Sequence, residues 1–182
     1  MTAVSLLGIC GSTRKASMNR SLLVALGELL PEGTAFTMWE GLEQIPIFNS
    51  DLQEPNAVLS LKAAIAAADG VVFAVPEYNY SIPGGLKNAL DWVSRPPTTS
   101  PLRGKPVGLV GAATGMSGTI RAQNHMRQML VYSDSPVLNQ PEVLIPRAQE
   151  RFVDGKLADE STRQLVARFA TAMVAHVHRY KV

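Results

Sequence analysis

One segment of the sequence combines hydroxyl groups with cations in the way that a phosphate-binding loop does. Residues 11–20 read GSTRKASMNR, and no acidic residue occurs in the chain before Glu28. Hydroxyl groups, an arginine and the free N–H groups at the start of a helix together suit a phosphate. The segment lacks the Gly-Lys-Ser/Thr of a Walker loop and the G-x-G-x-x-G of dinucleotide-binding proteins. A phosphate site is therefore one interpretation, and a solvated turn with a capping serine is the other.

A second segment places aromatic, acidic and amide side chains next to one another. Residues 76–92 read PEYNYSIPGGLKNALDW. Pro76 cannot continue a strand ladder, so the chain is expected to leave a sheet at this point. Aromatic faces and well-placed polar groups suit a planar ligand with polar edges. From these residues alone, a ligand platform and a structural loop are equally good interpretations.

A third segment, residues 111–118, reads GAATGMSG and consists mainly of small residues. Small side chains let a bulky ligand approach the backbone closely. Considered alone, this segment is better interpreted as a flexible loop.

Each of these segments follows a buried apolar run and precedes a helical pattern. Strands are predicted at Val4–Cys10, Thr34–Trp39, Gly70–Val75, Pro106–Ala113 and Val137–Ile145, the last interrupted by Pro141 and therefore at an edge. Helical spacing is found at Leu22–Leu30, Val58–Ala68, Gly84–Val93, Ile120–Leu130 and Leu165–Val177, with Ser17 or Asn19 as the first N-cap and Thr119 as the fourth.

Five β-α units with strands apolar on both faces indicate an α/β fold around a parallel sheet. We expect one domain, residues 1–182, with a flavodoxin-like doubly wound five-stranded parallel sheet, order 2-1-3-4-5, and helices on both faces. Ligands of such folds bind outside the carboxyl ends of the strands, near the switch point between the first and third strands. The three segments follow the first, third and fourth strands, so this sheet edge is where we expect a site.

The composition excludes several classes of protein. Seventeen Lys and Arg against fifteen Asp and Glu give a net charge of +2, too little for an electrostatic nucleic-acid binder. A single cysteine excludes an internal disulfide framework, and three scattered histidines predict no metal site. No apolar run approaches the ~20 residues needed to span a bilayer. The N-terminal residues do not resemble a signal peptide, so a soluble cytoplasmic protein is expected.

Two further residues have side chains that could be reactive or bind a ligand, but each has a simpler interpretation. Cys10 lies in the first strand, where a buried, inert thiol is expected. Glu40 follows the second strand, where dinucleotide-binding proteins keep a ribose-binding acid. Because the glycine fingerprint is missing, we interpret Glu40 as a solvated turn carboxylate.

The first two segments together resemble the NADPH-dependent FMN reductase family, which includes flavodoxin-like quinone, chromate and azo reductases. The match consists of G-S-x-R-x-x-S-x-N from Gly11 to Asn19 and P-E-Y-N-Y-S-x-P-G-x-L-K-N-A-x-D-W from Pro76 to Trp92. Residues 121–130 also look like the family's fourth helix, so the resemblance covers nearly the whole chain. The family commonly has a second glycine where this chain has Thr119, which leaves the shape of that loop open.

The resemblance implies an FMN site. The residues implied to hold the FMN phosphate are Ser12, Arg14, Ser17, Met18 and Asn19. Those implied to line the edge of the isoalloxazine ring are Pro76, Glu77, Tyr78 and Asn79, largely through their backbone, with Ala113 flanking the ring. No side chain is then needed as nucleophile or general base, because the redox chemistry belongs to the cofactor.

The function that the resemblance implies is that of an NAD(P)H oxidoreductase. A hydride passes from NADPH or NADH to N5 of FMN, and electrons then pass to a quinone, azo, chromate or flavin acceptor by a ping-pong mechanism. The helix at 84–93 follows the second segment directly and ends in the bulky Trp92, so we expect at least a dimer. The family resemblance implies that this helix region packs across a two-fold axis, in a homodimer or a homotetramer. The alternatives are a non-catalytic flavodoxin-like electron carrier and a nucleotide-binding regulatory module.

Overall fold

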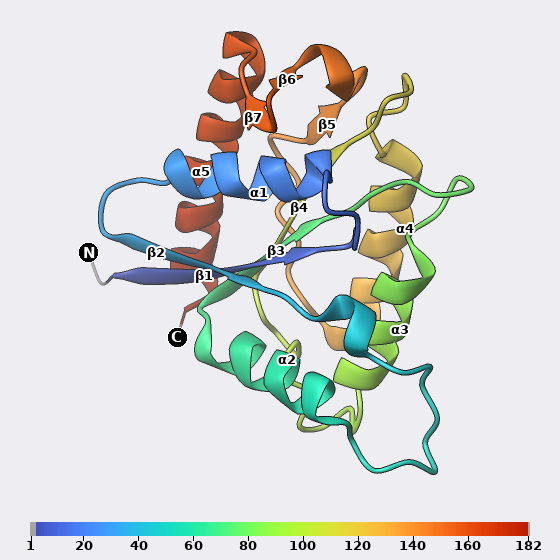
Figure 1. Ribbon diagram of the computed structural model, residues 1–182. Coiled ribbons are helices and arrows are strands. Elements are labelled where there is room, and N and C mark those ends of the chain that lie inside the picture. The colour runs from blue at the N-terminus through green and yellow to red at the C-terminus, as the bar shows by residue number, and fades with distance from the viewer. Residues whose placement is uncertain (1–2, 182) are drawn as a thin grey trace.

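Five parallel strands form the central sheet of the computed structural model, which describes residues 3–181 (Figure 1). The strands are β1 (Val4–Cys10), β2 (Thr34–Trp39), β3 (Gly70–Ala74), β4 (Val107–Ala112) and β5 (Val143–Ile145). Their order across the sheet is β2-β1-β3-β4-β5, which confirms the predicted topology. The direction of winding reverses between β1 and β3, and the loops that follow these strands separate there to leave a crevice.

Helices cover both faces of the sheet (Figure 1). They are α1 (Met18–Glu28), α2 (Asn56–Ala67), α3 (Gly84–Val93), α4 (Ile120–Leu130) and α5 (Glu160–Tyr180). One core cluster joins Leu22 of α1 and Phe169 of α5 to one face of the sheet. A second cluster joins residues of α2, α3 and α4, such as Ile65 and Leu86, to the other face. This two-sided burial explains why the strands are apolar at successive positions rather than alternating.

The predicted fifth strand is shorter than its sequence pattern indicates. Only residues 143–145 pair with β4, while Val137 makes an isolated bridge to Val107. Pro141 lies between these two contacts and has no N–H to donate, so the prediction of one strand from Val137 to Ile145 was wrong in its first half. The edge position predicted for this strand is confirmed.

A small antiparallel hairpin was not predicted. It consists of β6 (Phe152–Val153) and β7 (Lys156–Leu157), and β7 lies against α1. Strands of two residues are too short to produce a recognisable alternation of apolar and polar residues. Among residues 3–181, none of the helices is both long enough and apolar enough to cross a membrane.

Candidate functional site

The segments after β1, β3 and β4 meet in a hollow at the carboxyl ends of these strands. It encloses about 170 Å³ and is lined by Ser12, Arg14, Ser17, Met18, Asn19, Pro76, Glu77, Tyr78, Ala112, Ala113 and Thr114. We call it the strand-end hollow. Nine of the ten residues implied by the family resemblance line it, and Asn79 does not. Ala112 and Thr114 were not predicted individually, although they flank Ala113 in the segment of small residues.

The helix start at the strand-end hollow is built by Ser17. Its backbone is extended, and its Oγ accepts a hydrogen bond from the N–H of Arg20 at 3.3 Å, which makes Ser17 rather than Asn19 the N-cap. A helix begins with four N–H groups that have no partner inside the helix. One of these is satisfied by Ser17, and the first turn contains no acidic side chain. The N-terminal end of α1 therefore favours an anion.

Asn19 connects this helix start to the neighbouring strand end. Its Nδ2 donates to the carbonyl of Ala112 at 2.9 Å, and its Oδ1 accepts from the N–H of Ala112 at 2.9 Å. The side chain is buried, and both its amide nitrogen and its amide oxygen are bonded to the backbone of Ala112. What Asn19 can offer a phosphate is its backbone N–H, while its side chain positions the loop.

Glu77 performs a similar task for α4. Its carboxylate accepts hydrogen bonds from the Ser117 hydroxyl at 3.0 Å and from the Arg121 guanidinium at 2.8 Å. It also accepts from the backbone N–H groups of Arg121 and Ala122 at 3.1 and 3.4 Å. Burial tends to raise the pKa of Glu77, but these hydrogen bonds outweigh it and hold the pKa below its ordinary value. The carboxylate therefore caps α4 in its ionised form.

Thr119 occupies the N-cap position of α4, but its side chain makes no capping bond, so the capping role predicted for it was wrong. Its backbone is left-handed, with φ +75°, which is unfavourable for a β-branched residue. Its hydroxyl instead accepts from Gln123 Nε2 at 3.1 Å, and the same Nε2 donates to the carbonyl of Val143. The preceding Gly118 is also left-handed, and a Cβ there would lie 2.8 Å from the backbone carbon of Leu144. This loop is therefore held tightly against β5.

The segment after β3 forms a tight turn with two aromatic side chains. Tyr78 and Ser81 exchange backbone hydrogen bonds at 2.9 and 3.0 Å, and the two residues between them, Asn79 and Tyr80, both have positive φ. This turn directs Asn79 away from the strand-end hollow. Tyr78 lies beside the hollow, with its hydroxyl 3.5 Å from Ser12 Oγ. The Arg121 guanidinium lies over the Tyr80 ring, with its Cζ 4.2 Å from the centre of that ring.

The other residues that we considered chemical do not line the strand-end hollow, although Cys10, which is half-buried rather than fully buried as expected, lies with its Sγ 3.9 Å from Ser17 Oγ. Burial raises the pKa of the Cys10 thiol, which favours its unreactive neutral form. His125 lies 3.0 Å from the Ser81 hydroxyl, and His176 lies 2.9 Å from the Pro136 carbonyl. Within the part of the chain that the structure describes, no three His, Cys, Asp or Glu side chains gather as a metal site would require.

Comparison with known proteins agrees with this geometry. The model of the NADPH-dependent FMN reductase family matches residues 4–150. An NAD(P)H-dependent FMN reductase of Pseudomonas aeruginosa is 42% identical over 182 residues, covering 98% of this chain and 97% of the relative. A quinone reductase of Escherichia coli is 38% identical over 181 residues, covering 96% and 95% of the two chains.

A solved structure extends the agreement to three dimensions. The flavoenzyme NAD(P)H:(acceptor) oxidoreductase FerB from Paracoccus denitrificans superimposes with a TM-score of 0.88 at 31% identity. The superposition covers 98% of this chain and 99% of FerB. With sequence and fold in agreement along almost its whole length, the chain belongs to the NADPH-dependent FMN reductase family and is an FMN-using oxidoreductase of NAD(P)H.

Proposed function

We propose that this enzyme passes electrons from NAD(P)H through FMN to a small quinone acceptor by a ping-pong mechanism. The observation that supports this most is the convergence of three separate loops on one strand-end hollow, with nine of the implied FMN residues in its lining. Relatives named quinone reductase and 2-hydroxy-1,4-benzoquinone reductase support a quinone as the acceptor.

The lining fits FMN in its polarity. Ser12, Arg14, Ser17 and Met18, with the first N–H groups of α1, would hold the phosphate, and Asn19 would contribute its backbone N–H. The only acidic lining residue is Glu77, and its carboxylate is already bonded to Ser117 and Arg121. A phosphate in the strand-end hollow therefore meets no free carboxylate.

The fit in size is partial, and this has a consequence for the ring. Sites that enclose a drug-sized ligand usually hold about 300–1,000 Å³, whereas the strand-end hollow encloses about 170 Å³. We therefore place the phosphate and ribityl chain inside it and the isoalloxazine ring across its mouth. There the backbone of Pro76, Glu77 and Tyr78 would meet one edge of the ring, Ala113 would flank it, and Asn79 would contact only its outer end.

FMN, when bound, supplies the two-electron chemistry, taking a hydride from NAD(P)H and giving electrons to the acceptor. The residues of the chain would bind the phosphate and orient the ring. We propose that both substrates react at the same face of the ring, so that they bind in turn, and this is the basis for the ping-pong mechanism. No side chain in the strand-end hollow has to transfer a proton, which agrees with the engagement of Glu77 in capping α4.

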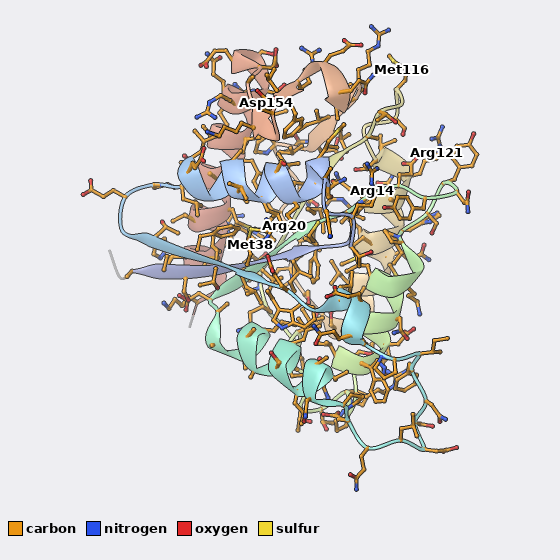
Figure 2. All side chains as sticks on the ribbon, in the orientation of Figure 1. Arg14, Arg20, Met38, Met116, Arg121 and Asp154 are labelled. Carbon is orange, nitrogen blue, oxygen red and sulfur yellow. The ribbon has the colours of Figure 1, made fainter. Side chains whose placement is uncertain are left out.

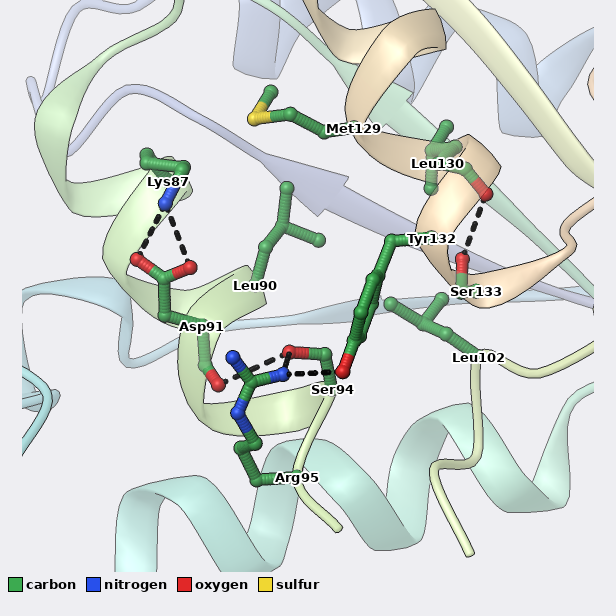
Figure 3. A pocket seen from close by; sticks show the side chains of 10 residues that line it. All are labelled: Lys87, Leu90, Asp91, Ser94, Arg95, Leu102, Met129, Leu130, Tyr132 and Ser133. Carbon is green, nitrogen blue, oxygen red and sulfur yellow. Dashed lines mark hydrogen bonds and ion pairs between the residues drawn. The ribbon is translucent and has the colours of Figure 1, made fainter. Parts of the chain in front are cut away.

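We further propose that the chain, which we take as one FMN-binding domain over residues 1–182, assembles as a homodimer or a homotetramer of two such dimers. A groove of about 230 Å³ separates the ends of α3 and α4 and contains the apolar side chains Leu90, Met129 and Tyr132 (Figure 3). Tyr132 is 59% exposed and accepts a hydrogen bond from Arg95. A two-fold contact along this groove would pair the α3 and α4 surfaces of two copies.

Trp92 does not take part in this surface. It is only 2% exposed, its indole N–H donates to the carbonyl of Pro46 at 2.8 Å, and Phe48 lies edge-on against it. The expectation that Trp92 makes the contact between subunits is therefore corrected, because its side chain belongs to the core of its own chain. A cytoplasmic location completes the proposal, since NAD(P)H is regenerated there and a single reduced thiol is stable there.

The test is a turnover assay on the purified protein with its visible spectrum recorded first. A bound flavin and catalytic oxidation of NADPH or NADH by a simple benzoquinone, with parallel lines in double-reciprocal plots, are expected. A flavodoxin-like carrier would bind flavin but consume no NAD(P)H without a partner protein. A nucleotide-binding regulatory module would bind without turnover. Either of these two results would refute the proposal.

A further inference from the structure

A second and larger hollow lies on the other side of the loop after β1, at the carboxyl end of β2. It holds about 500 Å³ and runs from Cys10 and residues 12–15 to residues 38–43. Arg20, in the first turn of α1, also lines it, as does Met38, and Figure 2 labels both side chains. We call it the β2-side hollow. Ser12 and Arg14 line both this hollow and the strand-end hollow, so the two sites are adjacent.

The floor of the β2-side hollow offers an apolar surface of the kind that a purine base needs. Met38, Trp39 and Leu42 line it together. The indole N–H of Trp39 donates to the hydroxyl of Ser60 at 3.2 Å, and Ser60 does not line the hollow. The polar group of Trp39 is therefore engaged by α2, and its half-buried ring packs against the core on that side while still lining the β2-side hollow.

The rim of the β2-side hollow brings an arginine and a carboxylate together. Arg20 forms an ion pair with Glu40, and the two side chains are 46% and 65% exposed. Lys15 lies in the same lining and has no ion-pair partner among residues 3–181. In dinucleotide-binding proteins an acid at this end of the second strand binds the ribose 2′-hydroxyl, and a nearby arginine accommodates a 2′-phosphate. Both residue types are present here although the glycine fingerprint is absent.

We propose that the β2-side hollow binds the adenosine end of NAD(P)H and that Arg20 selects NADPH by binding its 2′-phosphate. The proposal rests on the function proposed above. Arg20 would exchange Glu40 for the 2′-phosphate of NADPH, whereas Glu40 would accept a hydrogen bond from the free 2′-hydroxyl of NADH. Lys15 adds a second cation for the phosphate.

The placement agrees with the spacing of the strands. Neighbouring strands lie roughly 4.8 Å apart, so the end of β2 is about 10 Å across the sheet from the end of β3, two strands away. Dinucleotides in doubly wound folds lie across the ends of several strands. A nicotinamide over the flavin ring and an adenosine in the β2-side hollow can therefore belong to one molecule, passing over Ser12 and Arg14.

The kinetic test compares the reductive half-reaction of the FMN-loaded enzyme with each nucleotide. Bleaching of the flavin absorbance by increasing NADPH or NADH gives a dissociation constant for each without an acceptor. Arg20→Ala should raise the dissociation constant of NADPH about ten- to a hundredfold, the loss of one charge-assisted hydrogen bond, and leave that of NADH within about twofold. Glu40→Gln should have the opposite effect, strengthening NADPH relative to NADH. Arg103→Ala removes the same charge from an exposed residue at the other end of the sheet and should change neither.

A spectroscopic test needs no turnover. The chain has two tryptophans, and Trp92 is buried, so a ligand in the β2-side hollow should change chiefly the fluorescence of Trp39. Adenosine 2′,5′-bisphosphate should quench it in the FMN-loaded protein, 5′-AMP should do so at much higher concentration, and inorganic phosphate should not. Trp39→Phe should abolish the change, and Lys15→Gln should weaken it without removing an ion pair.

The outcomes separate this inference from the function on which it rests. Equal losses of NADPH and NADH affinity in Arg20→Ala, or unchanged Trp39 fluorescence with the bisphosphate, would overturn the adenosine site while NAD(P)H oxidation by the wild type still stood. A response to phosphate alone would mean an anion site without adenosine recognition and would also overturn it. Absence of any NAD(P)H oxidation by the wild type would instead refute the proposed function. Selective loss of NADPH binding together with quenching by the bisphosphate would establish the site.

Discussion

The side chain of Asn19 makes two hydrogen bonds to the backbone of one residue, Ala112, which lies 93 positions further along the chain. This pair joins the start of α1 to the end of β4. The loop proposed to hold the phosphate and the loop proposed to flank the ring are therefore fixed to each other before any ligand binds. Because these two loops are already fixed, less ordering of the chain is needed when the ligand binds.

Replacing Asn19 with Leu should therefore lower both stability and FMN affinity. The N–H and carbonyl of Ala112 would lose their partners in a buried position, and each such group costs roughly 1–3 kcal/mol. We expect the free energy of unfolding in urea to fall by at least about 2 kcal/mol. Asn124→Leu, on the exposed side of α4, is the matched control and should change it by less than about 0.5 kcal/mol. Wild-type stability in Asn19→Leu would contradict this role.

Arg14→Ala should weaken FMN far more than riboflavin, because riboflavin has no phosphate to lose. A hydrogen bond to a charged group contributes roughly 1.5–3 kcal/mol, so the dissociation constant of FMN should rise about ten- to a hundredfold. Quenching of flavin fluorescence by the apoprotein measures both ligands. Equal losses for the two would indicate damage to the fold or to the ring pocket. No loss for either would mean that the loop is only a solvated turn.

Tyr78→Ala should change turnover or acceptor preference while most of the FMN stays bound. Tyr78 lies at the mouth of the strand-end hollow, 46% exposed, with its hydroxyl beside Ser12 rather than deep in the phosphate loop. Steady-state rates with two quinones, measured at saturating FMN, would detect the change. Unchanged rates and acceptor preference under those conditions would remove Tyr78 from the ring platform.

Glu77 predicts a pH dependence of stability. Its folded-state pKa lies below its ordinary value, so the unfolded chain takes up a proton first as the pH falls. The stabilisation is therefore complete above about pH 5 and decreases as the pH falls below the unfolded pKa of about 4.3. Urea unfolding should be measured for the wild type and Glu77→Gln between pH 3 and 7. The difference between their free energies of unfolding should be large near neutrality and decrease in acid. A difference independent of pH would show that the charge of Glu77 does not stabilise α4.

The subunit contact along the groove of Figure 3 can be broken at Met129. Placing a charge there, as in Met129→Glu, should shift the sedimenting mass from at least twice the 19.6 kDa of one chain toward that of a single chain. Val153→Glu, at an exposed apolar residue of β6, is the control and should leave the mass unchanged. A wild-type protein that is active as a monomer at micromolar concentration would rule out the dimer altogether.

Features of the fold that depend on neighbouring residues could be predicted from the sequence. Strand β2 and helix α3 begin and end at the predicted residues, and Ser17 caps α1 as its hydroxyl and position indicate. The cap of α4 could not be found this way, because the carboxylate of Glu77 comes from a loop more than 40 residues earlier. Spacing marks where a helix starts, but it does not show which distant group satisfies its N–H donors.

At the candidate site, too, the sequence predicts which residues come together but not which contacts each of them makes. A family motif brings the implied residues to one hollow, yet it does not separate side chains that face a ligand from those that hold the loops. Asn19 and Glu77 both line the strand-end hollow, and both have their polar groups engaged by the protein. Asn79 belongs to the same motif, but a turn of two left-handed residues places it outside. Only the side-chain hydrogen bonds and the backbone geometry of the folded chain distinguish these cases.

The ion pair between Glu77 and Arg121 also affects the rate at which an anionic ligand associates with the protein. With that carboxylate paired to Arg121, the strand-end hollow presents Arg14 and the positive end of α1 to the surrounding solution. A patch of one sign attracts ligands of the opposite sign over about 10 Å at 0.1 M ionic strength and over less at higher salt. Added salt should therefore slow the association of FMN with the apoprotein while leaving that of uncharged riboflavin nearly constant.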